Sequence, residues 1–198
     1  MGFEIKIKEI ILEIEYLLVI LLIVSGLSDT IMSFFDKYYI CLLFILFHEL
    51  SHVFVGALLN KRLFKMFIGI SGATAFFKYN YLQKDRLYYF KETVIFLAGP
   101  ISNILVAYLF KDIDFIFEIN VFLSILNLLP IYPLDGFNIL KNILITLFIN
   151  NKNIINSIMK IISITFVLII SVICIIIFFN YNNVFSIIFL IYILFINI

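Results

Sequence analysis

The segment CLLFILFHELSHVFVGALLN, residues Cys41 to Asn60, decides how the rest of the chain is interpreted. It has the length and most of the hydrophobicity of a helix that crosses a bilayer, which takes about 20 apolar residues. Near its centre, however, stand His48, Glu49 and His52. A charged side chain at mid-bilayer costs roughly 2.5 to 3.5 kcal/mol. These residues therefore need a compensating partner.

The composition of the whole chain also indicates a membrane protein. Of its 198 residues, 64% are hydrophobic and 14% are charged, and the mean hydropathy is +1.17. Soluble domains are about half apolar and a quarter charged. The net charge of +1 provides no broad basic surface, so nucleic acid is not expected as a partner. Cys41 and Cys174 stand in apolar runs without metal or redox spacing, and core packing is the simpler interpretation.

Apolar runs separated by charged breaks predict an all-α integral membrane protein with about six transmembrane helices. The expected spans are Tyr16 to Phe35, Tyr38 to Leu59, Glu92 to Phe110, Phe115 to Ile149 with an interruption, Ile154 to Phe179, and Val184 to Ile198. The last run is short for a full span, so it could be only partly embedded.

The N-terminal segment FEIKIKEI, Phe3 to Ile10, alternates apolar and charged residues, which predicts a short strand or an interfacial segment. The first helix is preceded by more acidic than basic side chains, and no A-x-A cleavage pattern follows it. We therefore expect this helix to be retained. Most of the basic residues that connect the spans lie in the loop at 60–91. By the positive-inside rule, this loop and both termini are expected in the cytoplasm.

Within the basic loop, the run RLFKMFIGISGATAFFKYN contains two apolar stretches on either side of Ser71 and Gly72. This pattern predicts a small β-hairpin after the second helix. An edge strand of the hairpin could receive an extended peptide as an added strand. A hairpin that only covers the helices is an equally good interpretation.

On a helix, His48 and His52 are four residues apart, about one turn, so both imidazoles project to one side. Glu49 flanks the same surface. In this H-E-x-x-H arrangement the two histidines bind Zn²⁺ and the glutamate is the general base. A catalytic zinc site usually has a third protein ligand, so one more residue is required.

The run SILNLLPIYPLDGFNILKN provides the candidate. Pro130 and Pro133 disfavour helix, so the chain between Asn127 and Asp135 should be partly unwound. Unwound backbone at membrane depth must be buried in protein or line a watery cavity. Asp135 could cap the helix that follows or complete the metal site. Ligation is the stronger interpretation beside a buried H-E-x-x-H segment, because the metal would supply the missing positive charge.

The motifs FHELSH, LAGPISN and NLLPIYPLDG, in this order on successive expected spans, resemble those of the site-2 protease family of intramembrane zinc metalloproteases. The resemblance covers roughly Lys6 to Lys152, and the chain looks most similar to the stage IV sporulation protein FB branch. The resemblance implies one polytopic membrane protease domain over 1–198 with a catalytic core at about 38–150. Neither a PDZ domain nor a regulatory domain is expected.

The resemblance also implies roles for particular residues. His48, His52 and Asp135 would bind Zn²⁺, and Glu49 would be the catalytic acid and base. Asn127 matches an asparagine thought to assist at the reacting carbonyl, although it could instead cap the unwound carbonyls.

Three further residues match positions that bind substrate or support the site in this family. They are Asn103, Gly99 and Gly136. For Asn103, an interhelical hydrogen bond beside the close-packing Gly99 is the alternative role.

The implied function is hydrolysis of a peptide bond in or near the transmembrane segment of a membrane-tethered protein in the cell membrane. A pro-sigma factor processed during sporulation would be such a substrate, and membrane-embedded inhibitors or regulators are further candidate partners. The alternative is a non-proteolytic metal-binding membrane protein or ion carrier with the same ligands. That alternative gives Glu49 no particular role.

Overall fold

The computed structural model of the chain describes residues 2–7, 10–25, 29–69, 72–78, 85–181, 187, 190, 191 and 194. The chain divides into two compact units. The first contains Met1–Gln83 and Leu97–Ser124, and the second contains Lys84–Phe96 and Ile125–Ile198.

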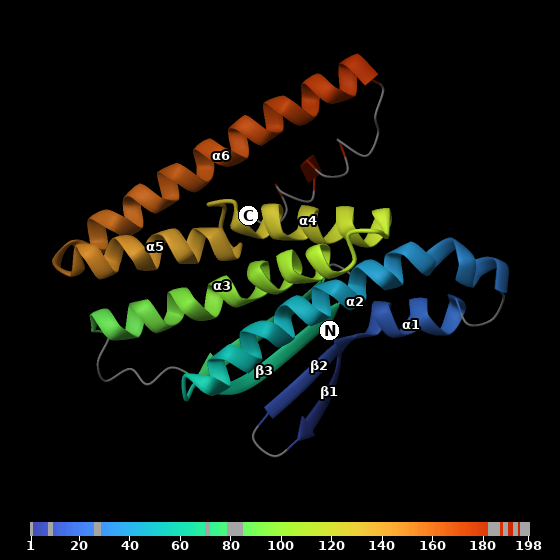
Figure 1. Cartoon of the computed structure of the whole chain (residues 1–198), viewed down its shortest axis with the longest axis horizontal. Helices are drawn as coiled ribbons and strands as arrows, with labels where there is room; N and C mark the ends of the chain where they lie inside the picture. The colour runs from blue at the N-terminus through green and yellow to red at the C-terminus, as the bar shows by residue number, and fades with distance from the viewer. Residues whose placement is uncertain are drawn as a thin grey trace. The chain divides into compact units, whose positions relative to one another are not determined.

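The first unit contains a four-stranded sheet in the order β1-β2-β3-β4. Its strands are β1 (Gly2–Ile7), β2 (Ile10–Glu15), β3 (Arg62–Gly69) and β4 (Gly72–Lys78). The predicted hairpin after the second helix is confirmed as β3 and β4, and the alternating N-terminal segment is a strand. The sequence did not predict that β2 pairs with β3 in parallel, which joins two hairpins into one sheet (Figure 1).

An ion pair links the two hairpins at the centre of the sheet. The Lys65 ammonium on β3 contacts the Glu13 carboxylate on β2. Its hydrogen bond to Glu13 raises the pKa of Lys65 above the ordinary value of 10.5. The protonated lysine is therefore favoured by the pairing of β2 with β3.

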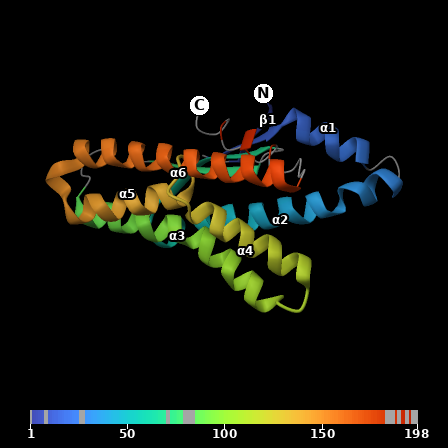
Figure 2. The same cartoon turned by 90° about the horizontal axis from the view of Figure 1, so that it is seen from above.

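Helices α1 (Tyr16–Ser25) and α2 (Asp29–Leu58) connect the two hairpins. Figure 2 shows that α2 runs back beside α1. The sequence placed a break between two spans near Phe35 and Tyr38, but α2 continues through these residues. The polar pair Asp36 and Lys37 contains no proline or glycine, so it does not end the helix.

Among the described residues, three helices are long and apolar enough to cross a membrane: Phe35–Leu58, Arg86–Leu109 and Ile149–Asn180. The six predicted spans are therefore not confirmed. α1 has 10 residues and is about 15 Å long, well short of the roughly 30 Å hydrocarbon core. The predicted last span, 184–198, lies almost entirely outside the described residues.

The predicted fourth span is divided into α4 (Asp114–Leu128) and α5 (Asp135–Leu147). Its interruption, residues 129–134, is non-helical as predicted and contains Pro130 and Pro133. The peptide bond between Tyr132 and Pro133 is cis. This interruption places the start of α5 directly after an irregular segment.

In the second unit, α5 leads through a short 3₁₀ turn (Ile149–Asn151) into α6 (Lys152–Tyr181). α5 and α6 run in opposite directions and are in contact (Figures 1 and 2). A hydrophobic core joins them to the beginning of α3 (Arg86–Leu109). Its buried residues are Tyr89, Phe137, Ile145, Ile155 and Met159.

Candidate metal centre

α2 places His48 and His52 on one side of the helix, one turn apart. Their side chains are 3% and 5% exposed, and their ring centroids are 4.8 Å apart with an interplanar angle of 83°. Two imidazoles that are both buried and close together provide two nitrogen donors of the kind that bind zinc.

Gly99 on α3 lies against both histidines. A Cβ atom at this position would overlap the Nε2 atoms of His48 and His52. These two nitrogens therefore face the same part of α3, and glycine leaves the space that they occupy. Because Gly99 has no side chain, both imidazoles fit against α3 at this position.

Asp135 is the first residue of α5 and is half-buried. The N-cap position belongs to Leu134, which makes no side-chain capping bond, so Asp135 is not the N-cap of this helix. The next residue, Gly136, is buried, and a Cβ atom there would overlap the backbone carbonyls of Leu128 and Leu129. Gly136 therefore allows α5 to begin directly against the end of α4.

His48, His52 and Asp135 could form a metal site. Each offers one ligand atom, and these atoms lie within 4.8 Å of one another. A tetrahedral zinc ion with bonds of about 2.0 to 2.2 Å separates neighbouring donors by about 3.4 Å. Two imidazoles and one carboxylate are also a donor set typical of catalytic zinc, so these residues fit the metal.

Glu49 is half-buried on α2, and its Oε2 atom accepts a hydrogen bond of 3.1 Å from the backbone N–H of Ala75. Ala75 lies on β4, at the edge of the sheet. β4 packs against α2 so closely that a Cβ atom at Gly56 would overlap the ring of Phe77. The sequence predicted the strand but not its contact with Glu49, because no local pattern indicates a contact between these two segments.

Asn103 and Asn120 are fully buried polar residues in the first unit, each 0% exposed. Asn103 lies one turn after Gly99 on α3, and neither atom of its amide has a hydrogen-bond partner among the described residues. The Asn120 amide donates to the Ile116 carbonyl at 2.9 Å. Sequence reasoning missed Asn120, although an asparagine in an otherwise apolar part of a helix is a signal that could have identified it.

Asn127 is half-buried near the end of α4. The suggested action of its amide at a reacting carbonyl, and the suggested role of Asn103 near the site, stay predictions.

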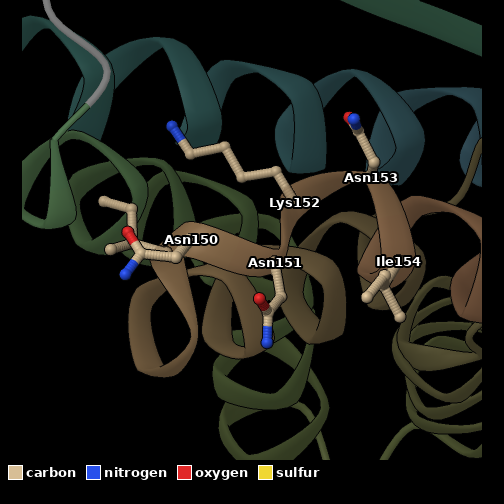
Figure 3. Close-up of a pocket in the computed structure, with 6 residues that line it drawn as sticks. Asn150, Asn151, Lys152, Asn153 and Ile154 are labelled. Atoms are coloured by element: carbon tan, nitrogen blue, oxygen red, sulfur yellow. The ribbon is translucent and has the colours of Figure 1, made fainter.

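A surface pocket of about 450 Å³ lies at the turn between α5 and α6. Asparagines and Lys152 line it (Figure 3). Lys152 also lies 5.1 Å above the ring of Tyr89. None of the predicted site residues lines this pocket, so it is distinct from the candidate metal centre.

The chain shares the fold of a site-2 protease. One solved structure that it resembles is the site-2 protease from Methanocaldococcus jannaschii, with a TM-score of 0.62 and 18% sequence identity over 100% of this chain and 94% of that chain. Comparisons with protein-family models and with curated proteins found no match. The fold of this neighbour and the apolar helices support membrane association. The narrower likeness to the stage IV sporulation protein FB branch is not supported by these findings.

Proposed function

We propose that this protein is an intramembrane zinc metalloprotease of the site-2 protease type. The observation that carries the proposal is the group formed by His48, His52 and Asp135, whose ligand atoms lie within 4.8 Å of one another. The fold shared with a site-2 protease supports the same conclusion. The reaction would be hydrolysis of a peptide bond in or near the transmembrane segment of a membrane-tethered protein.

The side chains of the site have distinct roles in this reaction. Zinc, when bound, would polarise the peptide carbonyl and lower the pKa of water at the site towards about 7. Glu49 would take a proton from the attacking water and return it to the departing amine. The N–H of Ala75 supports this role, because it fixes one oxygen of the carboxylate. The Asn127 amide would donate to the developing oxyanion, an effect of about 3 to 4 kcal/mol for single donors elsewhere.

A helical substrate must unwind before cleavage, because its carbonyls otherwise accept intrahelical hydrogen bonds. β4 supports this step, since it is an edge strand and also contacts α2. An extended peptide could pair with the open side of β4 beside Glu49. The substrate class that we propose, on resemblance alone, is a membrane-tethered transcription-factor precursor such as a pro-sigma factor, as in sporulation. Membrane-embedded inhibitors or regulators would act on the same enzyme.

We further propose a multi-pass arrangement in the cell membrane with both termini and the loop at 60–91 in the cytoplasm. The sheet supports part of this orientation. Because β2 pairs with β3, the segment before α1 and the segment after α2 belong to one side of the membrane. Open sheet edges do not occur in hydrocarbon, so that side is outside the lipid core. The excess of lysine and arginine in the loop favours the cytoplasmic side.

Glu49→Gln tests the proposal. The purified variant should keep its zinc, measured by elemental analysis, because glutamine leaves the three ligands in place. Co-expression with candidate single-span membrane proteins should give no shortened product, because an amide cannot accept the proton. His52→Ala is the matched control and should lose both zinc and cleavage.

Two outcomes would contradict the proposal. Equal activity of Glu49→Gln and the wild type would leave a metal-binding membrane protein or ion carrier as the better interpretation. A wild-type protein that contains no metal would indicate a purely structural helical protein.

A further inference from the structure

Ser163 on α6 holds the irregular segment that precedes Asp135. The Ser163 side chain is 3% exposed, and its hydroxyl oxygen accepts a hydrogen bond of 2.9 Å from the backbone N–H of Tyr132. The two residues are 31 positions apart in the sequence. This bond therefore ties the interruption between α4 and α5 to a different helix.

The backbone donors of the segment 129–134 explain why this bond matters. Two of its residues are prolines, which have no N–H. Three of the remaining N–H groups bond backbone carbonyls within the segment or in the last turn of α4. The N–H of Tyr132 instead bonds a side chain of α6. Without the Ser163 hydroxyl this N–H would lose its acceptor on α6, so the bond favours one position of the segment on that helix.

Apolar contacts hold the same segment against the same helix. Ile131 is 1% exposed and packs with Val167, one turn after Ser163 on α6. Leu129 and Leu134, at the two ends of the segment, pack against this pair. The apolar contacts hold the segment against α6, and the hydrogen bond between Tyr132 and Ser163 sets its position along that helix.

Asp135 follows this segment directly. Leu134 packs against the pair formed by Ile131 and Val167. Gly136, the second residue of α5, lies against the carbonyls of Leu128 and Leu129. The backbone on both sides of Asp135 is thus fixed by neighbours. A shift of the segment along α6 would move the Asp135 carboxylate with it.

We propose that Ser163 is a positioning residue for the metal site, which acts through the Tyr132 amide to place the carboxylate of Asp135. This inference rests on the proposed function, because it gives Asp135 the role of a zinc ligand. Ser163 is not one of the three proposed ligands. Its effect is to limit the positions that the ligand can adopt.

The test compares Ser163→Thr with Ser163→Val. These side chains have nearly the same shape, but threonine has a hydroxyl that can accept the Tyr132 N–H and valine has none. The dissociation constant for Zn²⁺ is measured by competition with a chelator, alongside the melting temperature. Removing a group that orients a metal ligand typically weakens metal binding 10- to 100-fold. We expect Ser163→Val and Ser163→Ala to bind zinc about tenfold more weakly and Ser163→Thr to bind like the wild type.

Ser171→Ala is the matched control on the same helix, because the Ser171 hydroxyl donates to the Val167 carbonyl of its own helix. It should leave the zinc dissociation constant unchanged. For a cleaved substrate, Ser163→Val should lower kcat with little change in KM, because the peptide still binds.

The outcomes separate this inference from the proposed function. If the wild type binds zinc and cleaves, but Ser163→Val binds zinc equally well, the positioning role is overturned and the protease is not. If the valine and alanine variants fail to fold while the threonine variant folds, the hydroxyl has a general structural role and the inference is wrong. If the wild type binds no zinc, both proposals fail.

Discussion

Gly99 and Gly136 are single residues whose missing side chains allow close packing at or near the candidate ligands. Gly99 leaves space for the Nε2 atoms of both histidines, and Gly136 lets α5 begin against the end of α4. A helix interior normally disfavours glycine by about 1 kcal/mol relative to alanine. The two glycines are explained by the close approach of other atoms: the histidine rings at Gly99 and the end of α4 at Gly136.

Gly99→Ala should weaken zinc binding by about 10- to 100-fold, the range found when groups that orient metal ligands are altered. The new Cβ atom would overlap the Nε2 atoms of His48 and His52, so the rings must turn or α3 must shift. Chelator competition measures the effect. Gly56→Ala is the control, because its Cβ would meet the Phe77 ring instead. Similar losses in both variants would count against a specific role for Gly99.

Asn103→Leu should raise the free energy of unfolding by about 1 kcal/mol, because a buried amide without a partner is costly and leucine has a similar size. The measurement is chemical unfolding of the protein in detergent micelles. If Asn103 also serves the reaction, cleavage will fall while stability rises. Asn120→Leu is the comparison. Its free energy of unfolding should rise less, since the Asn120 amide already donates to the Ile116 carbonyl. A large loss of stability in Asn103→Leu would instead indicate an interhelical hydrogen bond.

At the scale of elements, the contact between β4 and α2 joins the sheet to the H-E-x-x-H motif. The N–H of Ala75 points away from β3 and towards Glu49. Because backbone groups alternate between the two sides of a strand, the N–H of Ala73 has the same direction. In the described sheet β4 is an edge strand, and its outward side lies next to the residue that we propose as the general base.

Ala75→Pro removes the donor to Glu49 without removing a bond to β3, since proline is tolerated on the outward side of an edge strand. Hydrogen bonds to charged groups contribute about 1.5 to 3 kcal/mol. We expect kcat to fall at least about tenfold, with zinc content unchanged. Ala73→Pro is the matched control at the same edge and should retain more activity. Equal kcat values in the two variants would show that the Ala75 bond does not orient Glu49.

At the scale of the whole molecule, the candidate ligands come from α2 and α5, which lie far apart in the sequence. A metal that binds the folded chain and not the unfolded chain shifts the folding equilibrium by mass action. The candidate metal centre is therefore expected to contribute to stability as well as to chemistry.

Removal of zinc with a chelator should lower the melting temperature of the wild type. Free zinc at 100 times its dissociation constant stabilises the folded state by about 2.7 kcal/mol. Thermal unfolding with and without the chelator measures this difference. His52→Ala should melt at the same temperature in both conditions, because one ligand is missing. A wild-type protein that does not respond to the chelator would contradict the presence of a structural or catalytic metal.

The candidate ligands could be predicted from the sequence because local rules constrain them. Helical periodicity places His48 and His52 on one side, and the prolines before Asp135 prevent a continuous helix. The parallel pairing of β2 with β3 could not be predicted, since it joins segments separated by two helices and leaves no local pattern. The bonds that Glu49 and Ser163 accept from distant backbone amides are tertiary contacts of the same kind.

The parallel neighbours β2 and β3 also constrain the order of assembly during synthesis. Ribosomes add about 5 to 20 residues per second, so β3 is made a few seconds after β2. An isolated two-stranded hairpin is marginally stable at best, and the N-terminal hairpin must wait for its neighbour. The sheet can close only when α1 and α2 have brought β3 back beside β2. Sheet closure therefore depends on the fold of the two helices that separate β2 from β3.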